Sequence, residues 1–461
     1  MSYFIAFVIV YILRVLLRLN WWITGALFVF AVVMVPKHRK RYEKAAENQR
    51  RFYDVSLYLD TLLYSFVKEE KVELAIRDVS QTLSEGRLKT LVQNSYDYLQ
   101  MTFDEVAVLE EGLSKIEREY SCQRIRTVHQ FMCHVEFYGG EIEKPINLLL
   151  ADKSRWEKRV KEALVERKKQ MVDILLSVAA SVCICAAILS LPVMDMDISK
   201  EWVVQIASFL VIAANDLIVL KAQGYLGVDW LQVQLSEDES YYVQKMEALR
   251  EYQEEKEKKR SKLLGSMGIA AAAVCFFLQK EWLVVFCLLL SLFLFQQHRI
   301  GKNLLRNNLI KEIKHQFPNW LLDLVLLLQS ENVQVALQKS KEHVPGVLRK
   351  ELHLLTERLA MQPEASAPYH AFLKEFDIPE VHSAMGILYS LSIGNSGNAD
   401  KQINELVEKN LEMLDVTETE LLKNAAAGMY VLFLLPVVTA SFKLLVDMVL
   451  LMLRFISMPM V

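Results

Sequence analysis

Predominantly apolar stretches alternate with long charged stretches along the whole chain. The apolar stretches cover residues 3–13, 21–35, 171–193, 203–220, 265–278, 282–295 and 429–442. A helix of about 20 apolar residues spans the roughly 30 Å hydrocarbon core of a bilayer, because each residue adds about 1.5 Å. We therefore predict an all-α integral membrane protein with about seven to eight transmembrane helices. For residues 3–17 and 444–458 the pattern fits both a crossing and an interfacial helix.

The charged stretches carry a helical repeat of apolar positions. In residues 38–170, apolar side chains recur three and four positions apart, for example from Phe52 to Phe66. Gly139 and Gly140 are expected to end one of these helices. No part of this stretch alternates with period two for long enough to form a strand. The pattern therefore predicts a helical bundle.

Residues 298–424 show the same pattern and predict a second bundle. Pro318 and Pro379 stand where proline suits the first turn of a helix, so we expect helices to begin there. Pro345 interrupts the pattern. Gly394 is expected to end the helix before the last one.

These stretches divide the chain into seven segments. They are an N-terminal membrane hairpin (1–37), a first helical bundle (38–170), a pair of transmembrane helices (171–221), a charged helical connector (222–263), a second membrane hairpin (264–297), a second helical bundle (298–424) and a C-terminal membrane segment (425–461). A basic cluster at residues 37–41 follows the first hairpin and predicts that the bundles lie in the cytoplasm. Asn215 and Asp216 fall near the cytoplasmic end of a span, where we interpret them as solvated.

Composition agrees with a membrane protein. The mean hydropathy of +0.19 is high for 461 residues, because polar surface pulls the mean of a soluble protein below zero. The net charge of −3 offers no basic surplus for a nucleic-acid partner. The six cysteines show no metal or disulfide spacing, which fits soluble parts in a reducing cytoplasm. Arg14 and Arg18 follow the first apolar stretch, so we expect a retained anchor and not a cleaved signal.

Motifs for catalysis are missing or incomplete. No complete phosphate-binding loop occurs in the sequence. Gly394, Ser396 and Gly397 match the turn of an intramembrane serine protease, but no histidine follows His382 to act as the base. His134 lies on an apolar helix face and is interpreted as a packed side chain. We predict that the chain is not an enzyme and holds no cofactor or metal.

The two halves of the chain resemble each other. A shift of about 260 residues maps one half onto the other, including the flanking membrane stretches. Residues 140–147 align with residues 397–404 at one constant shift of 257 positions (397 − 140). Lys144 then falls on Lys401. We interpret the chain as an internal duplication of one bundle with its membrane helices.

At these residues the chain resembles a known family. Residues 317–323 (FPNWLLD), their spacing to Ala336 and Leu337, and the late glycine turn are similar to the F-domain superfamily. These are the inner-membrane platform proteins of type II secretion, type IV pili and Tad (Flp) pili, and the Tad type is the most similar. The resemblance covers nearly the whole chain. Tyr53 replaces the family's proline in the first half, and residues 395–396 depart from its Gly-Gly-x-Leu turn.

The resemblance implies a fold and a function. It implies two cytoplasmic six-helix bundles in one chain, and a non-catalytic platform in the cytoplasmic (inner) membrane. Such a platform couples a hexameric motor ATPase to the insertion of pilin-like subunits. The implied partners are that ATPase, the subunits, the lipid bilayer, and a second copy of the chain or a paralogue. A membrane transporter, or a scaffold unrelated to secretion, is the alternative. A transporter needs buried charges or broken spans near the midplane, and in the sequence only Pro436 suggests one.

Two glycine turns are the candidate partner-contact sites. Their polar side chains are either a docking surface for the ATPase or an ordinary solvated helix face. The candidate residues are Gly139, Gly140, Glu141, Lys144 and Asn147 in the first half, and Gly394, Gly397, Asn398, Lys401 and Asn404 in the second.

Overall fold

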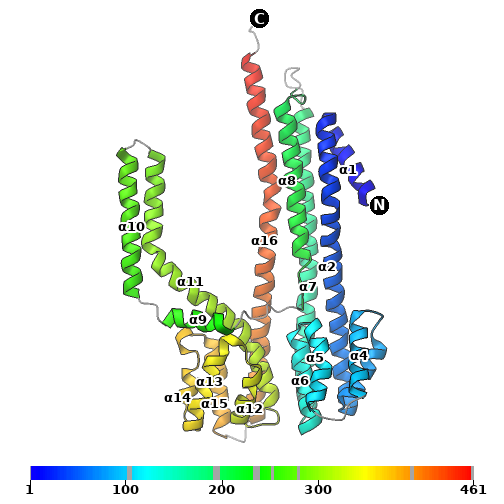
Figure 1. Ribbon diagram of the computed structural model, residues 1–461, viewed down its shortest axis with the longest axis vertical. Coiled ribbons are helices and arrows are strands. Elements are labelled where there is room, and N and C mark those ends of the chain that lie inside the picture. Colours follow the sequence, from blue (N-terminus) through cyan, green and yellow to red (C-terminus); the bar gives the residue numbers. More distant parts are fainter. Residues whose placement is uncertain are drawn as a thin grey trace. The chain divides into compact units, whose positions relative to one another are not determined.

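The computed structural model describes residues 2–100, 106–190, 198–231, 239–250, 254–277, 281–394 and 399–457. Within these ranges every regular element is a helix, which confirms the all-α prediction (Figure 1). The chain divides into two compact units. The first contains Met1–Phe137, Leu149–Val233 and Thr419–Val461, and the second contains Tyr138–Leu148 and Gln234–Glu418.

The first unit contains a helical bundle. Its helices are α2 (Trp21–Glu69), α3 (Val72–Thr82), α4 (Arg87–Gln100), α5 (Val106–Glu119), α6 (Gln123–Tyr138) and α7 (Glu143–Ser190). Phe52, Leu62 and Val79 are fully buried between them, and each such side chain contributes about 1.5–3 kcal/mol by burial. The Phe52 ring meets the Trp156 ring of α7 edge-on, with centroids 4.9 Å apart. We call residues 52–100, 106–137 and 149–167 the first bundle.

Four described helices are long and apolar enough to cross a membrane. They are α2, α7, α8 (Trp202–Leu226) and α16 (Ala399–Ser457). A fifth is reached if the bent pair Val284–Gln296 and Gly301–Leu327, which meet at 57°, counts as one span. α1 (Ser2–Leu16) is apolar but shorter. The total of seven to eight spans stays a prediction.

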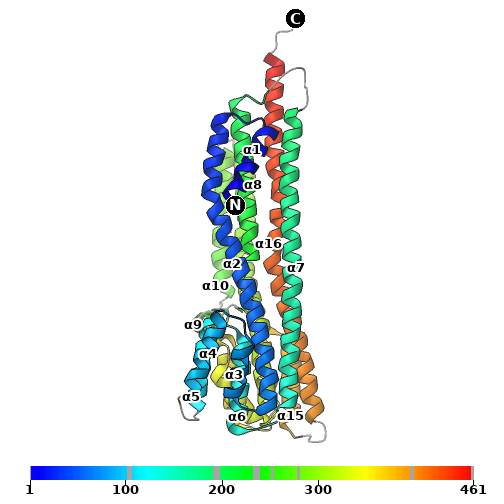
Figure 2. The ribbon, with the colours of Figure 1, turned by 90° about the vertical axis from the view of Figure 1, so that its right-hand side faces the viewer.

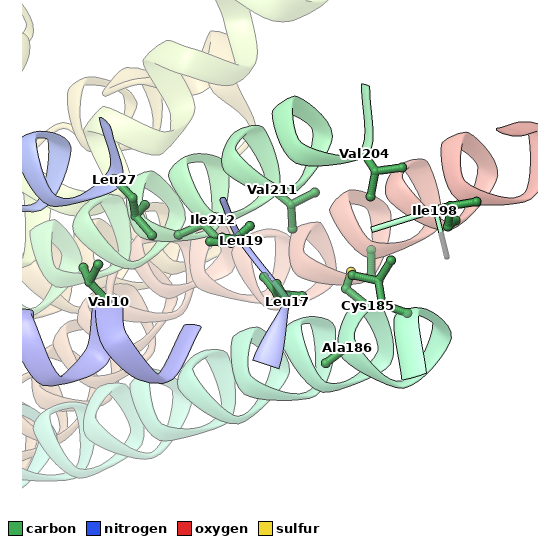
Figure 3. Close-up of a cluster of buried hydrophobic side chains, with 12 residues drawn as sticks. Val10, Leu17, Leu19, Leu27, Cys185, Ala186, Ile198, Val204, Val211 and Ile212 are labelled. Atoms are coloured by element: carbon green, nitrogen blue, oxygen red, sulfur yellow. The ribbon is translucent and has the colours of Figure 1, made fainter. Parts of the chain in front are cut away.

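The membrane helices of the first unit pack around a shared apolar cluster. Leu17 and Leu19 at the α1–α2 turn meet Cys185 of α7, Val211 of α8 and Ala440 of α16. Figure 3 shows the side chains of α7, α8 and the turn converging there. α7 and the C-terminal half of α16 lie side by side (Figure 2). Lipid tails are as apolar as these side chains, so close packing and polar contacts hold the helices together.

α16 runs unbroken through the C-terminal membrane segment. Pro436 lies inside this 59-residue helix. Residues 444–457 therefore extend the same helix, and they do not turn back for a second crossing or along the surface. Hydroxyl groups supply hydrogen bonds near the proline, as is common in membrane helices. Ser177 of α7 donates to the Phe433 carbonyl at 2.9 Å, and the Thr439 hydroxyl oxygen lies 2.9 Å from the Pro436 carbonyl.

The second unit contains the other bundle. The elements of the second unit are α9 (Glu239–Arg250), α10 (Glu254–Phe277), α11 (Glu281–Leu327), α12 (Val333–Lys339), α13 (Gly346–Met361), α14 (Ala367–Ala371), α15 (Pro379–Ser392), the start of α16, and the short 3-10 helices η1 (Ser340–His343) and η2 (Lys374–Phe376). Trp320 is 1% exposed and stacks on Phe372, with centroids 6.0 Å apart. We call residues 309–394 and 399–418 the second bundle.

Pro318 does not begin a helix, contrary to the sequence-based prediction. It lies inside α11, which starts far upstream at Glu281. A proline within a helix leaves the carbonyl four residues earlier without its usual amide donor. That carbonyl belongs to Lys314, and the Thr417 hydroxyl of α16 donates to it at 3.3 Å. A neighbouring helix therefore supplies the bond that the proline removes. By contrast, α15 does begin at Pro379 as predicted.

The charged connector is divided between the two units, because residues up to Val233 belong to the first and the rest to the second. α9 packs against α11 and α13 at one end of the second bundle (Figure 1). Lys350 of α13 binds Glu247 of α9 at 3.1 Å. α10 then continues from charged into apolar sequence and pairs closely with α11. Ser291 of α11 donates to the Gly265 carbonyl at 2.7 Å, and an added Cβ at Gly268 would lie 2.9 Å from the Ser291 Cβ.

Candidate functional site

The first candidate turn separates α6 from α7. Gly139 and Gly140 have φ angles of +69° and +139°, which side-chain-bearing residues rarely adopt. The backbone of this turn therefore favours glycine at both positions, which agrees with the helix end predicted here from the sequence. An added Cβ on Gly140 would lie 3.6 Å from the Ser330 Cβ in the second unit's loop after α11.

The second candidate turn separates α15 from α16. Gly394 has a φ angle of +74° and follows Ile393, the C-cap residue of α15. A glycine in the left-handed conformation commonly ends an α-helix in this way. Gly397 and Asn398 lie outside the described residues. α16 begins at Ala399, so Lys401 and Asn404 occupy its first two turns.

The two turns lie side by side in the second unit. The Lys144 ammonium is 3.4 Å from the Asp400 carboxylate and 3.4 Å from the Glu141 carboxylate. The hydrogen bond to Asp400 raises the pKa of Lys144. Asp400 remains 84% exposed, so solvent screens this pair and it adds little to stability. The internal repeat aligns Lys144 with Lys401, whereas in the structure Lys144 pairs with Asp400, the residue before Lys401.

The eight described candidate residues are all exposed. They are Gly139, Gly140, Glu141, Lys144, Asn147, Gly394, Lys401 and Asn404. Their charges are mixed, and nothing among them resembles a nucleophile held by a base. This surface offers charge pairs and amides to a partner, and it offers no catalytic geometry.

Contacts between α7 and α16 recur at nearly one sequence spacing. Within the second unit, Lys144 meets Asp400, 256 residues later. Within the first unit, Ser177 meets Phe433 at a spacing of 256, and Ser181 meets Thr439 at 258. Residues 256 to 258 positions apart therefore lie at the same level on two parallel helices. The internal duplication stays a prediction.

A buried polar chain in the first bundle was not foreseen. The Tyr58 hydroxyl is 2.7 Å from His129 Nε2, and His129 Nδ1 is 2.9 Å from the Glu117 carboxylate. Burial raises the pKa of Tyr58 well above its usual range. The arrangement resembles a relay, but Tyr58 is 0% and His129 2% exposed, so no substrate reaches it. The histidine that the sequence singled out, His134, is only half-buried.

The Glu157 side chain of α7 is expected to make the stability of the first bundle sensitive to acid. Burial alone would raise its pKa, but hydrogen bonds from Lys153 and Lys161 lower it from 4.5 to about 2. A carboxylate with a depressed pKa stabilises the folded state above its unfolded pKa. That stability is lost as the pH falls through about 2. The full shift is equivalent to about 3 kcal/mol, and solvent screening reduces it to about 1–2 kcal/mol.

We therefore expect Glu157→Gln to flatten the acid limb of the stability curve. Thermal unfolding of the full chain in detergent, followed by circular dichroism between about pH 2 and pH 6, measures this. Glu43→Gln is the control, because Glu43 is 58% exposed and its pair with Arg39 is solvated. An unchanged acid limb in Glu157→Gln contradicts the assignment.

A polar junction joins the first bundle to the membrane helices. His38 of α2 is 3.2 Å from Asp216 and 2.8 Å from Gln223, both on α8. Arg167 of α7 donates to the Tyr225 carbonyl at 2.9 Å. Its guanidinium lies 4.4 Å from the centroid of the Trp230 ring. Three helices are thus tied together where the bundle meets the spans.

Asn215 is not solvated, contrary to the sequence-based interpretation. It is 2% exposed, donates to Ser181 of α7 at 3.2 Å and accepts from Thr439 of α16 at 2.9 Å. Its position in the sequence suggested a helix end, but two distant helices supply its partners. The neighbouring Asp216 is 32% exposed through its side chain and binds His38.

The membrane helices also bury a charged pair that the sequence analysis did not single out. Lys443 and Asp447 of α16 are each 0% exposed. The Lys443 ammonium donates to Asp447 Oδ2 at 2.5 Å. The spacing of four residues inside an apolar stretch was the available signal, because it places both groups on one helix face.

Comparison with known proteins gives no further guide. No known family, curated protein or solved structure matches this chain. Across the described residues, no group of histidine, cysteine and carboxylate side chains could hold a metal ion.

Proposed function

We propose that the chain is a non-catalytic platform protein of a type II secretion, type IV pilus or Tad-pilus-like machine in the cytoplasmic membrane. Both bundles would lie in the cytoplasm, where they would bind a hexameric motor ATPase. The membrane helices would receive pilin-like subunits. The family resemblance of the sequence, the four to five helices suited to a bilayer and the exposed, non-catalytic turns support this proposal. The seven to eight spans and the cytoplasmic side belong to the same proposal.

One observation carries the mechanism. α7 runs for 48 residues, about 70 Å, without a break from the first bundle into its apolar stretch. Within the first unit, the junction of His38, Arg167 and Asp216 ties the base of the bundle to α2 and α8. A stiff helix transmits a tilt from one end to the other. A movement that a motor imposes on the bundle would therefore reach the membrane helices.

A flexible insertion tests this coupling. Four glycines inserted after Lys168 would uncouple the bundle from the span while leaving the sequence of each intact. We expect filament assembly or secretion in the native cells to be abolished. The same insertion after Glu364, in the exposed loop between α13 and α14, is the control and should be tolerated.

Normal assembly by the Lys168 insertion variant would contradict the lever mechanism. Failure of the native chain to co-purify with any cytoplasmic ATPase would contradict the platform function itself. ATP hydrolysis by the purified chain alone would do the same.

A transporter is the second candidate function. The buried Lys443–Asp447 pair favours it, because charges inside a membrane bundle often mark ion pathways. Ion or solute uptake by liposomes containing only this chain would favour transport over a platform.

A further inference from the structure

Polar side chains are stacked at several levels inside the membrane helices of the first unit. On α16 they stand at positions 439, 443, 447 and 454, which a helix brings onto one face. Thr439 bonds Asn215 of α8 at 2.9 Å, and Arg454 pairs with Glu201 at the start of α8. The Lys443–Asp447 pair lies between these two levels. Asp447 is about 10 Å along the helix axis from Arg454.

Asp447 is incompletely satisfied. Its Oδ2 accepts from Lys443, but its Oδ1 is buried and has no hydrogen-bond partner in the described part of the chain. A buried carboxylate oxygen without a protein donor is costly, because burial removes it from bulk water. The free oxygen is therefore a basic position enclosed in an apolar setting.

A purely structural role explains this pair poorly. Polar groups that hold membrane helices together bond from one helix to another, as Asn215 does to Ser181 and Thr439. Lys443 and Asp447 belong to the same helix, four residues apart, so their bond ties no second helix. Burying two charges is expensive, and here no interhelical contact repays that cost.

We propose that Asp447 is a proton-binding site within the membrane helices, with Lys443 as its counter-ion. A proton adds to Oδ1 and converts the carboxylate to the carboxylic acid, while Oδ2 keeps the bond from the Lys443 ammonium. The pair changes from neutral to a net charge of +1, so the Lys443 charge becomes uncompensated. Proton release restores neutrality. The site does not depend on the proposed platform function.

Its surroundings provide polar groups on both sides. Cys185 of α7 is buried in the same cluster as Ala440 of α16. One helical turn towards the bundle lies Thr439 with its Asn215–Ser181 partners. In the other direction along α16, the half-exposed Arg454 pairs with Glu201 near the C-terminal end of that helix. Leu450 and Leu451 pack against the apolar cluster that contains Cys185 and Ala440.

Infrared spectroscopy tests the site directly. The full chain in lipid nanodiscs would be titrated between about pH 5 and pH 9, and the carboxylic acid carbonyl band followed. We expect a band that grows as the pH falls, disappears in Asp447→Asn and shifts in frequency in Asp447→Glu. Asp216→Asn is the control and should leave that band in place. The acid fraction should fall about tenfold for each pH unit above the midpoint.

Removing the counter-ion provides a second test. Lys443→Met deletes the cation that favours the ionised carboxylate, so the band should persist to a pH about one unit or more higher. Lys443→Arg keeps the charge and should move the midpoint less. The proposal is overturned if the native chain and Asp447→Glu show no titrating band that differs between them, because the pair is then a fixed ion pair. A midpoint unmoved in Lys443→Met overturns the role of Lys443.

Discussion

Arg124→Ala is expected to destabilise the first bundle by about 3–5 kcal/mol. Arg124 of α6 binds both oxygens of Asp152 on α7, at 2.7 and 3.1 Å. Its guanidinium also lies 5.1 Å from the centroid of the Trp156 ring. The two charged side chains are only 10% and 4% exposed. Truncating the arginine leaves the Asp152 carboxylate buried without its cation, and this uncompensated charge is the main cost.

A double variant separates charge from packing. Arg124→Met combined with Asp152→Leu removes both charges and keeps much of the volume, so it should be less destabilising than Arg124→Ala alone. Amide hydrogen exchange of α6 in the full chain in detergent measures the local opening free energy. Arg126→Ala is the matched control, because Arg126 is 45% exposed and 3.7 Å from Glu117, and should cost less than about 1 kcal/mol. Equal costs for the two arginines would refute the argument.

Trp320→Ala should destabilise the second bundle by about 3–5 kcal/mol. Trp320 is 1% exposed, packs between Phe317 and Phe372, and donates its indole N–H to Ser340 at 3.2 Å. Its truncation leaves a cavity and removes the indole donor from the Ser340 hydroxyl, which still donates to the Leu337 carbonyl at 2.9 Å. Hydrogen exchange in α11 and α13 of the full chain should rise, while exchange in the first bundle should be unchanged.

Trp320→Phe serves as the matched control for the cavity. It retains an aromatic ring against Phe372 and loses only the indole bond to Ser340, so its cost should be about half that of alanine or less. If phenylalanine costs as much as alanine, the hydrogen bond and not the packed volume dominates at this position.

Features governed by local chain chemistry could be predicted from the sequence. The stripe from Phe52 to Phe66 is buried as its periodicity indicated, because helical spacing alone fixes which face is apolar. Gly139 and Gly394 mark turns because their φ angles are positive. The described candidate residues are exposed, as a partner-contact surface requires.

Features governed by contacts between distant residues could not be predicted from the sequence. The local sequence at Pro318 indicates a helix start. It does not show that Thr417 supplies the hydrogen bond that the proline ring removes from the helix. Asn215 reads as a solvated helix end unless Ser181 and Thr439 are known to surround it. In both cases the deciding partner lies far away in the sequence, on another helix. Such partners follow from the fold and leave no local pattern.

The near-constant spacing of contacts between α7 and α16 has an evolutionary consequence. Matched positions at one level on two parallel helices are what a two-fold axis between identical subunits would produce. A half-length ancestor with one bundle would have paired with itself through this helix. Under the predicted duplication, fusing two genes would fix the ratio of the halves at one to one and would free each copy to diverge.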